Sequence, residues 1–551
     1  MAVSMPPITG AVAAAVVTIM VFLSYGLRRV GRRPKGFPPG PPTLPLIGNI
    51  HQIPSERPHL QFQKWAQEYG PIYSLILGTR VVVVLSSDAA VKDLLDKRSN
   101  IYSSREGFYL ARVLSGGYRM VLMEYGETWR MVRKLVHNSL NIVSSRAYVP
   151  YQDLENKAML LGFLKDPSQF FGHIRRYTNS LSTQMLFGFR TTRNDDPKLL
   201  QLYHGFDKFS EAAASQPAAM LDIFPILRHL PDALVPMKRR AREFHRQELD
   251  LYKGHYLETR RKIRQGIAKP CFCVDLVRAQ EEQHFSDDIA CYVSGTLLEA
   301  GSDTTAATLI GFVQAMVIFP EVSKAAQAEI DRVCGDRLPD LNDVPDLPYI
   351  RGCVKESLRW MPTAIMGIPH AVTRDDEYMG YKIPKGAEVM YNVWAIHNDP
   401  KRHPDPRRFD PTRWANDSQT SQEAATNPDV SKRDHFTFGA GRRLCQGMHI
   451  ADRSLFLAIS RLLWAFDFGK AVDKTSGKEI TPDTNALSRG MLVTPEPFEA
   501  NIKPRSARKA DQIREEWRKA TALLDREMQW ENVPEGLIWR DYEPAEHAAA
   551  R

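Results

Sequence analysis

The spacing of apolar and polar positions predicts two small β regions in a chain that otherwise follows helical periodicity. Apolar runs at residues 72–77 and 81–85 flank a short turn signal, which predicts a strand pair. A second β-rich stretch, residues 368–396, contains turn signals at Met379-Gly380 and at residues 384–386. Most of the remaining chain repeats its apolar positions at the spacing of an amphipathic helix. We therefore expect a mainly α fold with small β-sheet regions.

Three predicted helices stand out by length or composition. Residues 237–266 are highly charged, which is typical of a solvated face. Residues 447–466 repeat apolar positions in the manner of a core helix. The third segment, residues 288–319, is apolar and long for a globular protein, and Pro320 should end it.

The middle of this third segment is polar. The run Ala300-Gly301-Ser302-Asp303-Thr304-Thr305 contains poor helix formers, and a carboxylate inside an apolar helix costs free energy. We interpret the run as a functional distortion of the helix. Two other interpretations stay open: a kinked core helix in which Asp303 is satisfied locally, and a second membrane span.

The N-terminus has the pattern of a membrane anchor. No charged residue occurs in residues 1–27, and residues 8–27 as a helix would span ~30 Å. A basic and proline-rich hinge, residues 28–42, follows, and no acidic residue precedes Glu56. The positive-inside rule then predicts a single-pass protein with residues 1–7 on the lumenal side and everything after Leu27 on the cytosolic side. A cleaved signal peptide, the alternative, carries its charge before the apolar stretch.

Composition and cysteine usage narrow the function classes. With 551 residues and 43% hydrophobic residues, the chain is long enough for a large core. Its formal charge of +9 favours an acidic partner or an anionic membrane surface; no nucleic-acid-binding motif accompanies it, so nucleic acid is not an expected ligand. The six cysteines show no disulfide framework, which fits a reduced, cytosolic body.

Cys445 is surrounded by residues that suit a metal-bound thiolate. It follows a glycine-rich bend that carries Arg442 and Arg443, and it precedes the helix of residues 447–466. Arginines and a helix N-terminus both supply the positive potential that a thiolate needs at neutral pH. Glycines let the backbone approach a large flat group closely. Heme iron bound by cysteine is the best-known ligand with these requirements.

The run from Phe438 to Gly447 resembles the F-x-x-G-x-R-x-C-x-G signature of the cytochrome P-450 family, the heme-thiolate monooxygenases. The five defined positions are occupied by Phe438, Gly441, Arg443, Cys445 and Gly447. The resemblance implies the cytochrome P-450 fold over residues 43–505, with heme b (iron-protoporphyrin IX) as cofactor and Cys445 as the ligand of its iron.

The polar run at mid-helix resembles the oxygen-binding motif A-G-x-D-T-T of the same family. By this resemblance Ala300 and Gly301 leave a groove for dioxygen, Thr304 hydrogen-bonds the bound oxygen, and Asp303 helps to relay protons. The chemistry needs such a pair, because cleavage of the O–O bond consumes two protons in a site otherwise kept dry.

Glu356 and Arg359 match the family's E-x-x-R motif and share one helical face. The run Pro406-Arg407-Arg408-Phe409 resembles its P-x-R-F element. The resemblance implies a buried network of Glu356, Arg359 and Arg408 that locks a helix against the cysteine loop, a structural role.

Trp129 and Arg133 match W-x-x-x-R, the motif whose arginine pairs with a heme propionate in the family. Arg443 and His370 occupy other positions that contact propionates, although a structural role for His370 stays open. His397 is interpreted as structural. A dianionic porphyrin edge explains why buried arginines would be needed.

The sequence contains no flavin or nicotinamide fingerprint. The resemblance to microsomal members therefore implies that electrons come from the membrane-bound NADPH-dependent flavin reductase, with cytochrome b5 as a second donor, docking on a basic face near the cysteine loop. The recognition segments expected from the family are mostly apolar, so a hydrophobic small molecule is the expected substrate; they are residues 103–123, 206–224, 293–298, 362–369 and 486–491.

The chain also resembles fungal enzymes of secondary metabolism, and the expected reaction is insertion of one oxygen atom from O2 into a secondary-metabolite intermediate. Two alternatives stay open: an oxygen-independent heme-thiolate isomerase or dehydratase, and a non-catalytic heme protein. The intact Asp303-Thr304 pair favours the monooxygenase over the isomerase or dehydratase. No methionine or histidine partner opposite Cys445 is evident for an electron carrier.

The C-terminal extension, residues 506–551, continues beyond the point where typical family members end. Its apolar residues Ile513, Trp517, Ala520, Leu524 and Met528 repeat at helical spacing in a charged background, which predicts an amphipathic helix. Whether the extension packs on the body or contacts a partner or lipid stays open.

Overall fold

The computed structural model describes residues 12, 14–15, 17–18, 29–105 and 108–531, apart from the side chain of residue 214. The predicted anchor, residues 8–27, lies almost wholly outside the described residues, as do residues 1–7 and 532–551. Val12 and Val17 are helical positions of the anchor that are described, and they are 57% and 54% exposed.

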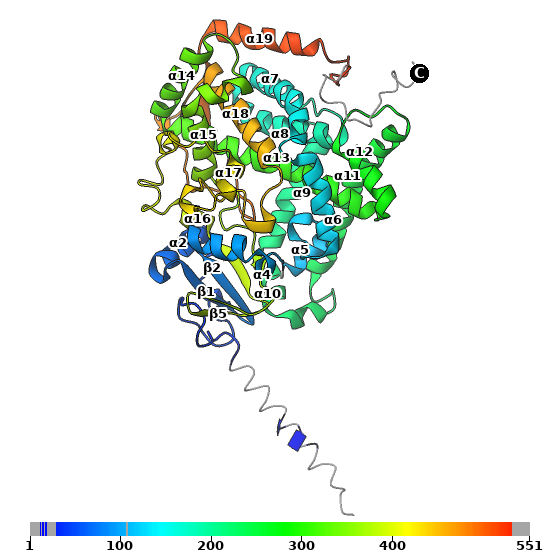
Figure 1. The fold of residues 1–551 in the computed structure, drawn as a ribbon, viewed down its shortest axis with the longest axis vertical. Coiled ribbons are helices and arrows are strands. Elements are labelled where there is room, and N and C mark those ends of the chain that lie inside the picture. The colour runs from blue at the N-terminus through cyan, green and yellow to red at the C-terminus, as the bar shows by residue number, and fades with distance from the viewer. Residues whose placement is uncertain (1–11, 13, 16, 19–28, 106–107, 532–551) are drawn as a thin grey trace, which may run out of the picture.

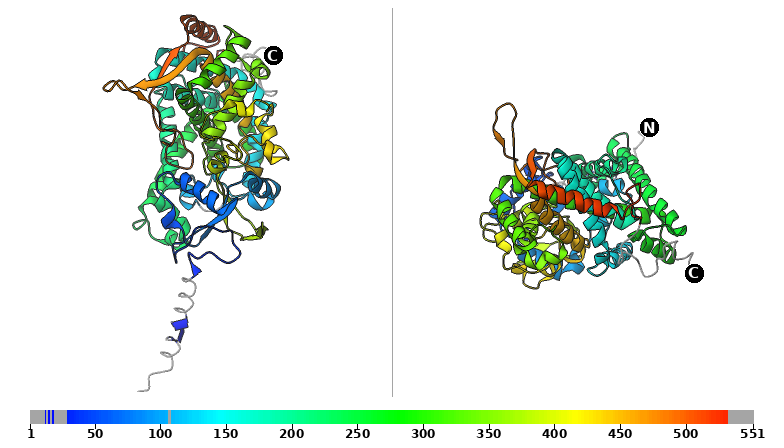
Figure 2. Two further views of the ribbon diagram at one scale, coloured as in Figure 1. Left: turned by 90° about the vertical axis from the view of Figure 1, so that its left-hand side faces the viewer. Right: turned by 90° about the horizontal axis from the view of Figure 1, so that it is seen from above.

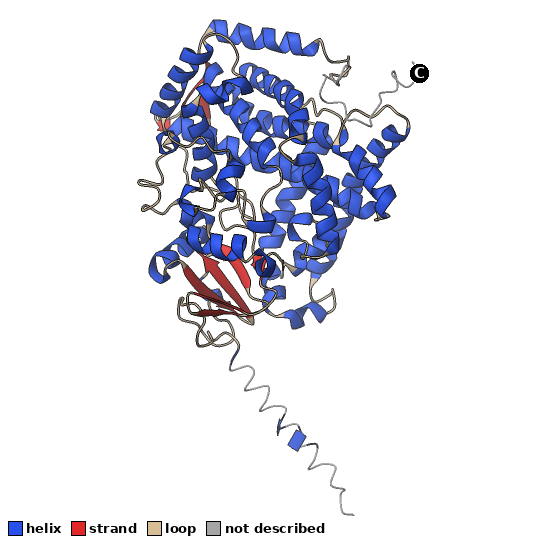
Figure 3. Ribbon diagram, viewed as in Figure 1, coloured by secondary structure: helices blue, strands red, loops and turns tan. Residues whose placement is uncertain are grey.

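Helices dominate the body, as predicted (Figure 3). They are α2 (Pro58–Tyr69), α3 (Asp88–Val91), α4 (Ser99–Tyr102), α5 (Tyr109–Leu114), α6 (Glu127–Leu140), α7 (Val149–Lys165), α8 (Phe170–Phe187), α9 (Pro197–Ala214), α10 (Gln216–Ile223), α11 (Pro236–Arg264), α12 (Phe272–Gln283), α13 (Asp287–Ile318), α14 (Pro320–Cys334), α15 (Pro348–Trp360), α16 (Val393–His397), α17 (Ser421–Thr426), α18 (Met448–Ala465) and α19 (Ala507–Thr521).

The strands form small sheets at two edges of the helical body. They are β1 (Ile72–Leu77), β2 (Arg80–Leu85), β3 (His370–Ala371), β4 (Asp376–Tyr378), β5 (Tyr381–Ile383), β6 (Glu388–Tyr391), β7 (Phe466–Val472), β8 (Glu479–Ile480) and β9 (Ala500–Pro504).

Both predicted β regions are confirmed. Strands from both join in one sheet of order β1-β2-β6-β3, while β4 and β5 of the second region form a separate antiparallel pair. β1 and β2 form the predicted antiparallel pair, and β6 pairs in parallel with β2, which brings Val83 beside Val389. The pairing fits the composition, because strands buried on both faces are continuous apolar runs. The end of the second region differs from the prediction: residues 393–397 form helix α16 rather than strand.

Helix α13 crosses the middle of the body and packs along α8, with α18 beside it (Figure 1). Its bounds confirm the predicted segment of residues 288–319, and Pro320 ends it by starting α14 after a sharp turn. The C-terminal half of α13 lies in the buried apolar core with α7, α8, α15 and α18, and its N-terminal half packs in a second apolar cluster with α11 and α12.

Within the described part of the chain, no single helix is long and apolar enough to cross a membrane. Helices α13 and α14 reach that length and hydropathy only as a pair, and the pair is bent by 105°.

The charged helix α11 confirms the prediction for residues 237–266, but one of its faces is buried. Leu249, Tyr252 and Tyr256 belong to an apolar cluster, and the side chain of Glu248 is also buried. The helix is therefore amphipathic rather than solvated all round.

The proline-rich hinge packs on the first sheet. Ser74 on β1 bonds the carbonyls of Pro38 and Pro39, each at 2.7 Å, and Arg33 donates to the carbonyls of Gly40 and Ser74, each at 2.9 Å. Proline has no N–H but keeps its carbonyl, so the hinge accepts hydrogen bonds from the sheet despite its proline content.

The described part of the C-terminal extension, residues 506–531, packs on the body. Its helix α19 lies across α7 and α18 at the end of the molecule remote from the first sheet (Figures 1 and 2). The helix ends at Thr521, before the predicted periodicity does, and the chain then turns so that Leu524 and Trp530 enter the same apolar cluster as Tyr151.

Candidate active site

Cys445 lies in the loop between α17 and α18, in a bend that only glycine allows. The Cys445 N–H donates to the carbonyl of Phe438 at 2.9 Å and closes the loop. Gly441 has φ +60°, and its N–H donates to the Asp96 carboxylate at 2.6 Å. A Cβ at Gly441 would lie 1.9 Å from the carbonyl oxygen of Leu95, so no larger residue fits.

The Cys445 side chain is exposed, whereas the other five cysteines are buried. Protein nonetheless encloses its remaining sides, and this burial raises the pKa of the thiol. The Gly447 N–H, at the start of α18, and the charge of Arg133 act in the opposite direction but do not outweigh burial. The N–H of Gly447 and the charge of Arg133 are thus the local groups that favour a thiolate, as the sequence suggested, and a bound metal cation would favour it further.

A buried ion pair fixes α15 relative to the cysteine loop. The Glu356 carboxylate accepts hydrogen bonds from Nε and Nη2 of Arg359 at 2.8 and 2.6 Å, and neither side chain is exposed. Arg359 Nη1 donates to the carbonyl of His397 at 2.9 Å. His397 Nε2 in turn accepts from the N–H of Phe436 at 2.8 Å, two residues before Phe438. His397 is thus structural, as interpreted.

The third member of this network is Arg413, and the assignment to Arg408 is wrong. Arg413 Nε lies 3.4 Å from the Glu356 carboxylate, whereas the Arg408 side chain is 56% exposed and lies 3.7 Å from Glu321. The signal was present: Pro411-Thr412-Arg413-Trp414 is a second P-x-R-aromatic run. Its tryptophan indole N–H donates to Glu356 at 3.1 Å, a bond that phenylalanine cannot make.

Three arginines without a carboxylate partner among the described residues gather beside the cysteine loop. Arg105, Arg133 and Arg443 donate to backbone carbonyls instead. Burial and the charges of Arg105 and Arg133 lower the pKa of Arg443 to about 8. The Trp129 ring centroid lies 4.1 Å from the guanidinium carbon of Arg443 and 5.7 Å from that of Arg133.

His370, on β3, adds an unpartnered ring nitrogen to this region. Its Nδ1 lies 2.6 Å from the carbonyl of Tyr102, which assigns the proton to Nδ1, and its buried Nε2 has no partner in the described chain. Burial, with Arg105 and Arg443, holds the pKa of His370 well below its usual range.

Uncompensated arginines and an orphaned nitrogen beside an exposed cysteine fit the acidic edge of a heme. The structure thus gathers Trp129, Arg133, His370 and Arg443 as expected. It adds Arg105, which belongs to no motif but stands in recognition segment 103–123.

Helix α13 carries its polar run without a break. The carbonyl of Ser302 accepts hydrogen bonds from Thr178 Oγ1 at 2.6 Å and from Tyr203 Oη at 3.0 Å, so α8 and α9 both bond to this part of the polar run. A Cβ at Gly301 would lie 2.4 Å from Ser182 Oγ, so this glycine also permits the close contact of α13 with α8.

The same turn of α13 is open. Ala300 and Gly301 are exposed, although residues 306–317 of the helix are all buried. Thr304 Oγ1 donates to the carbonyl of Ala300 at 2.7 Å. Burial raises the pKa of Asp303 to about 7. The positive charge of Arg175 opposes this rise, and the negative charges of Asp207 and Glu299 reinforce it. A carboxyl group with this pKa both gains and loses a proton near neutral pH.

A buried charge cluster that no sequence pattern indicated lies where recognition segments meet. Arg119 pairs with Glu248 of α11 at 2.5 Å and with Glu299 of α13, and all three side chains are at most 5% exposed. The Arg119 guanidinium carbon lies 3.7 Å from the ring centroid of Phe209 on α9. The cluster therefore joins four parts of the chain, and two of them, residues 103–123 and 206–224, are expected recognition segments, which places a buried charge beside segments that are mostly apolar. Its members are 129 and 180 residues apart in sequence, so no local motif could indicate it.

An exposed cysteine at the start of a core helix, an uncompensated arginine group and an open turn of a long central helix together define a heme-thiolate enzyme. The cytochrome P450 family model matches residues 38–502, and the chain therefore belongs to the cytochrome P450 family. The family and the fold imply a heme cofactor.

Curated relatives of the chain are fungal monooxygenases. It is 60% identical to the cytochrome P450 monooxygenase virE of Hypocrea virens over 96% of each chain. It is 56% identical to fogE of Aspergillus ruber, with 97% of this chain and 99% of fogE covered. It is 52% identical to fsoB of Humicola fuscoatra, with 95% of this chain and 97% of fsoB covered. The chain is thus a monooxygenase, and such enzymes use O2 and redox partners and bind hydrophobic substrates.

The match to fogE also bears on the C-terminal extension. Since it covers 97% of this chain, it includes part of residues 506–551, which lie beyond the end of the family model at residue 502. The extension is therefore shared with a relative.

Solved structures show the same fold at lower identity. A zebra fish cytochrome P450 with abiraterone is 23% identical, with a TM-score of 0.63, and covers 82% of this chain and 100% of its own. A zebra fish cytochrome P450 with progesterone is 24% identical, with a TM-score of 0.65, and the match covers 81% of this chain and 99% of that one.

Proposed function

We propose that this monooxygenase inserts one oxygen atom of O2 into a hydrophobic secondary-metabolite intermediate, with electrons that NADPH supplies through a flavin reductase. The observation that carries the proposal is the uncompensated arginine group near the exposed side chain of Cys445, because one large anionic cofactor satisfies both. The fungal monooxygenases among its relatives support the biosynthetic setting.

Heme b, when bound, supplies the iron that activates dioxygen. Cys445 would be its protein ligand, on a loop shaped by Phe438, Gly441 and Gly447. The acidic edge of the cofactor would be held by the basic group described above: Arg105, Arg133, His370 and Arg443, with Trp129 between two of the guanidiniums. The charge of that edge would raise the lowered pKa values of these groups.

Asp303 and Thr304 are the residues that would move protons. Asp303, with a pKa of about 7, takes a proton from solvent and releases it inside the site. The Thr304 hydroxyl donates to Ala300 and keeps lone pairs that accept a further hydrogen bond. An oxygen-independent isomerase or dehydratase and a non-catalytic heme protein need no such pair, so its presence favours the monooxygenase over both alternatives.

Electrons would arrive at a basic face beside the cysteine loop. Arg130 and Lys134 of α6 and Arg442 of the loop are exposed there, which suits the acidic surface of a reductase or of cytochrome b5. A helical anchor over residues 8–27 would hold the enzyme at the endoplasmic reticulum membrane beside that reductase. Release of the full-length protein by alkaline carbonate would contradict the anchor.

The reaction class is tested by spectroscopy and cofactor dependence. The ferrous–carbonyl complex should show the red-shifted Soret band of thiolate ligation, and Cys445→Ala should abolish it. Product formation from a panel of hydrophobic substrates should require O2, NADPH and the reductase together. Turnover in the absence of oxygen would instead support the isomerase.

A further inference from the structure

A cavity lies away from the cysteine loop, between the body and the C-terminal extension. Its volume is about 500 Å³, and α7, α8, the loop after Gly188 and the extension all contribute to it. Four of its lining residues are cationic, and the extension supplies an aromatic and an apolar side chain; they are Lys165, Arg176, Arg190, Arg193, Trp517 and Met528. The volume is in the range of small-molecule sites.

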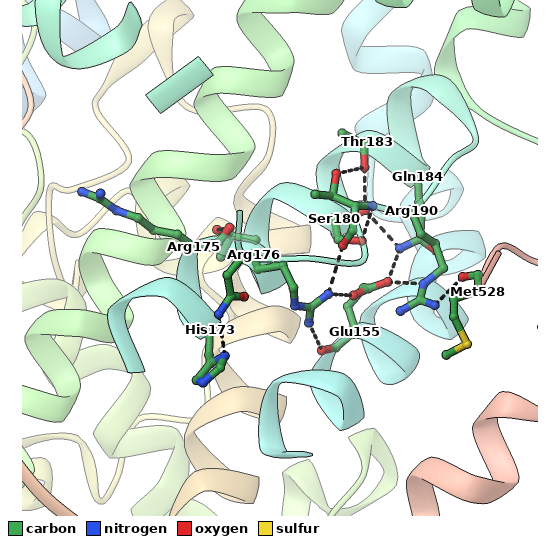
Figure 4. Close-up of polar contacts among 12 residues, drawn as sticks. Glu155, His173, Arg175, Arg176, Ser180, Thr183, Gln184, Arg190 and Met528 are labelled. Atoms are coloured by element: carbon green, nitrogen blue, oxygen red, sulfur yellow. Dashed lines mark hydrogen bonds and ion pairs between the residues drawn. The ribbon is translucent and has the colours of Figure 1, made fainter. Parts of the chain in front are cut away.

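The inner wall of this cavity carries more positive than negative charge. Arg176 and Arg190 share one buried carboxylate: Arg176 Nη1 donates to Glu155 at 2.5 Å and Arg190 Nε donates to it at 2.6 Å (Figure 4). The side chains of Arg176 and Arg190 are 6% and 2% exposed, and that of Glu155 is fully buried. Two guanidiniums on one carboxylate leave a net charge of +1 in a buried position, which is costly without a further anion.

Both arginines keep hydrogen-bond donors that the described residues do not use. Arg190 Nη1 donates to the carbonyl of Met528 at 2.6 Å, but Nη2 has no acceptor; Arg176 Nε has none either. At the rim, Lys165 has no ion pair among the described residues. Arg193 donates two hydrogen bonds to Asp195, at 2.8 and 2.5 Å, and Asp195 also lines the cavity, so the rim as a whole carries a net charge of +1. The free donors therefore belong to side chains that line a single cavity.

The extension completes the site with a flat apolar wall. The ring centroid of Trp517, on α19, lies 5.8 Å from the guanidinium carbon of Arg190. Met528, in the loop that follows α19, also lines the cavity. The cavity thus combines clustered cations with an aromatic face, the combination that binds a phosphate joined to a planar or apolar group.

We infer that this cavity binds an organic phosphate, whose phosphate group contacts Arg176, Arg190, Arg193 and Lys165 and whose body packs on Trp517. Guanidiniums match phosphate oxygens in a bidentate manner, and a dianion balances the inner and rim charges together. Because the ligand would touch both body and extension, its binding should hold the extension in place. Neither heme nor the proposed reaction takes part, so this inference stands apart from the proposed function.

The first experiment measures binding to the full-length holoenzyme. Titration calorimetry with AMP, inorganic phosphate and adenosine, at ionic strength matched with sodium chloride, separates the phosphate from the planar body. We expect saturable AMP binding with a Kd of about 1 mM or lower, weaker binding of inorganic phosphate, and none of adenosine. Absence of saturable binding by both AMP and phosphate overturns the inference.

Variants at the rim test the location while the buried arginines stay intact. Lys165→Gln with Arg193→Gln should weaken AMP binding about tenfold or more, since each charge-assisted hydrogen bond contributes about a tenfold change. Trp517→Ala should reduce AMP affinity to that of inorganic phosphate. The matched control is Arg514→Gln with Arg518→Gln, two exposed arginines of α19 outside the cavity, which removes the same charge. Equal losses in the rim variant and the control would show a nonspecific charge effect and overturn the site.

A readout independent of affinity uses the extension itself. AMP at saturating concentration should slow proteolytic removal of the extension severalfold in the wild type and in the Arg514/Arg518 control, but not in the Lys165/Arg193 variant. If AMP binds yet leaves the cleavage rate unchanged, the ligand does not bridge body and extension, and the site as described is wrong.

Discussion

The Nε of Arg413 lies 3.4 Å from the Oε1 of Glu356. The same carboxylate also accepts hydrogen bonds from the Arg359 guanidinium and the Trp414 indole. Glu356 therefore holds three residues from two separate segments, and the ion pair within α15 becomes a link between α15 and the segment before α17. Two predictions about arginines separated by only five residues follow from this contact.

Arg413→Ala should destabilise the protein by about 1–3 kcal/mol and reduce the fraction that retains heme, because it removes a donor from a fully buried carboxylate. Arg408→Ala is the control, and it should cost less than about 0.5 kcal/mol because its side chain is 56% exposed. Thermal unfolding and the ferrous–carbonyl band measure the two effects. A larger loss in the Arg408 variant would restore the assignment made from sequence.

Trp530→Ala should destabilise the body although the residue lies far beyond the end of the family model. The side chain is 4% exposed, and its indole N–H donates to Gln184 at 2.6 Å. Loss of a buried tryptophan costs about 3–5 kcal/mol. Leu523→Ala, at a position 41% exposed, should change stability by less than about 0.5 kcal/mol. Urea unfolding distinguishes them, and equal effects would mean that the extension is not part of the core.

Asp303→Asn should change both stability and turnover, and the stability effect depends on pH. Burial raises the native pKa of Asp303 from 3.8 to about 7, so the native carboxyl keeps its proton where the unfolded one has lost it. Stability due to this group is present below pH ~4 and is lost as pH rises toward 7. The melting temperature of the Asn variant relative to wild type should therefore be higher at pH 8 than at pH 5.

The same variant should lower kcat by roughly 10²-fold, because it removes a group that gains and loses a proton at neutral pH. Leu309→Ala, a buried core substitution on the same helix, is the control for general damage to α13. It should lower stability without this loss of kcat in the folded fraction. Unchanged kcat in Asp303→Asn would remove Asp303 from the proton path.

Thr304→Ala should uncouple reductant consumption from product. Its hydroxyl donates to the carbonyl of Ala300 in the open turn of α13. In the proposed reaction it would hydrogen-bond dioxygen and help to deliver a proton to it. NADPH oxidation should continue while product falls and hydrogen peroxide rises. Thr308→Ala, whose hydroxyl donates to the Thr304 carbonyl at 3.1 Å one turn later, should stay coupled. Full coupling in Thr304→Ala would reject its role.

Arg119→Met should destabilise the protein by about 3–5 kcal/mol, because it leaves Glu248 and Glu299 buried without their cation. Adding Glu248→Gln and Glu299→Gln should recover part of the loss, since the uncompensated charges are then gone. Thermal unfolding of the single and triple variants measures this coupling. If the triple variant is less stable than the single one, the cluster is not held together by charge.

The cysteine loop could be predicted from sequence because its requirements are local. Glycine at position 441 is fixed by a φ of +60° and by the nearby Leu95 carbonyl, and its neighbours Arg443 and Cys445 follow within four residues. The bounds of α13 and α11 were likewise set by periodicity and proline. Such features depend on residues close in the chain, so a single sequence contains them.

Other parts of the site depend on contacts between distant segments, and sequence alone misled or missed them. The choice of Arg413 over Arg408 depends on which side chain the turn after His397 directs at Glu356. The pKa of the Cys445 thiol depends on how completely the surrounding protein buries the sulfur, and this burial, which raises it, cannot be read from the local sequence. Arg105 has no motif and becomes part of the site only because β3 places His370 beside it.

The sequence by itself therefore determined the family, the glycine-rich loop of Cys445, the position of the polar turn in α13 and the order of the main helices, because these depend on short-range spacing and backbone conformation. The tertiary structure decided which arginine completes the Glu356 network, that Arg119 stands between two glutamates, and that the C-terminal extension joins the core and forms a cationic cavity with α7 and α8. These features are set by burial and by charges brought together from segments far apart, and electrostatic free energy depends on distance in space rather than along the chain.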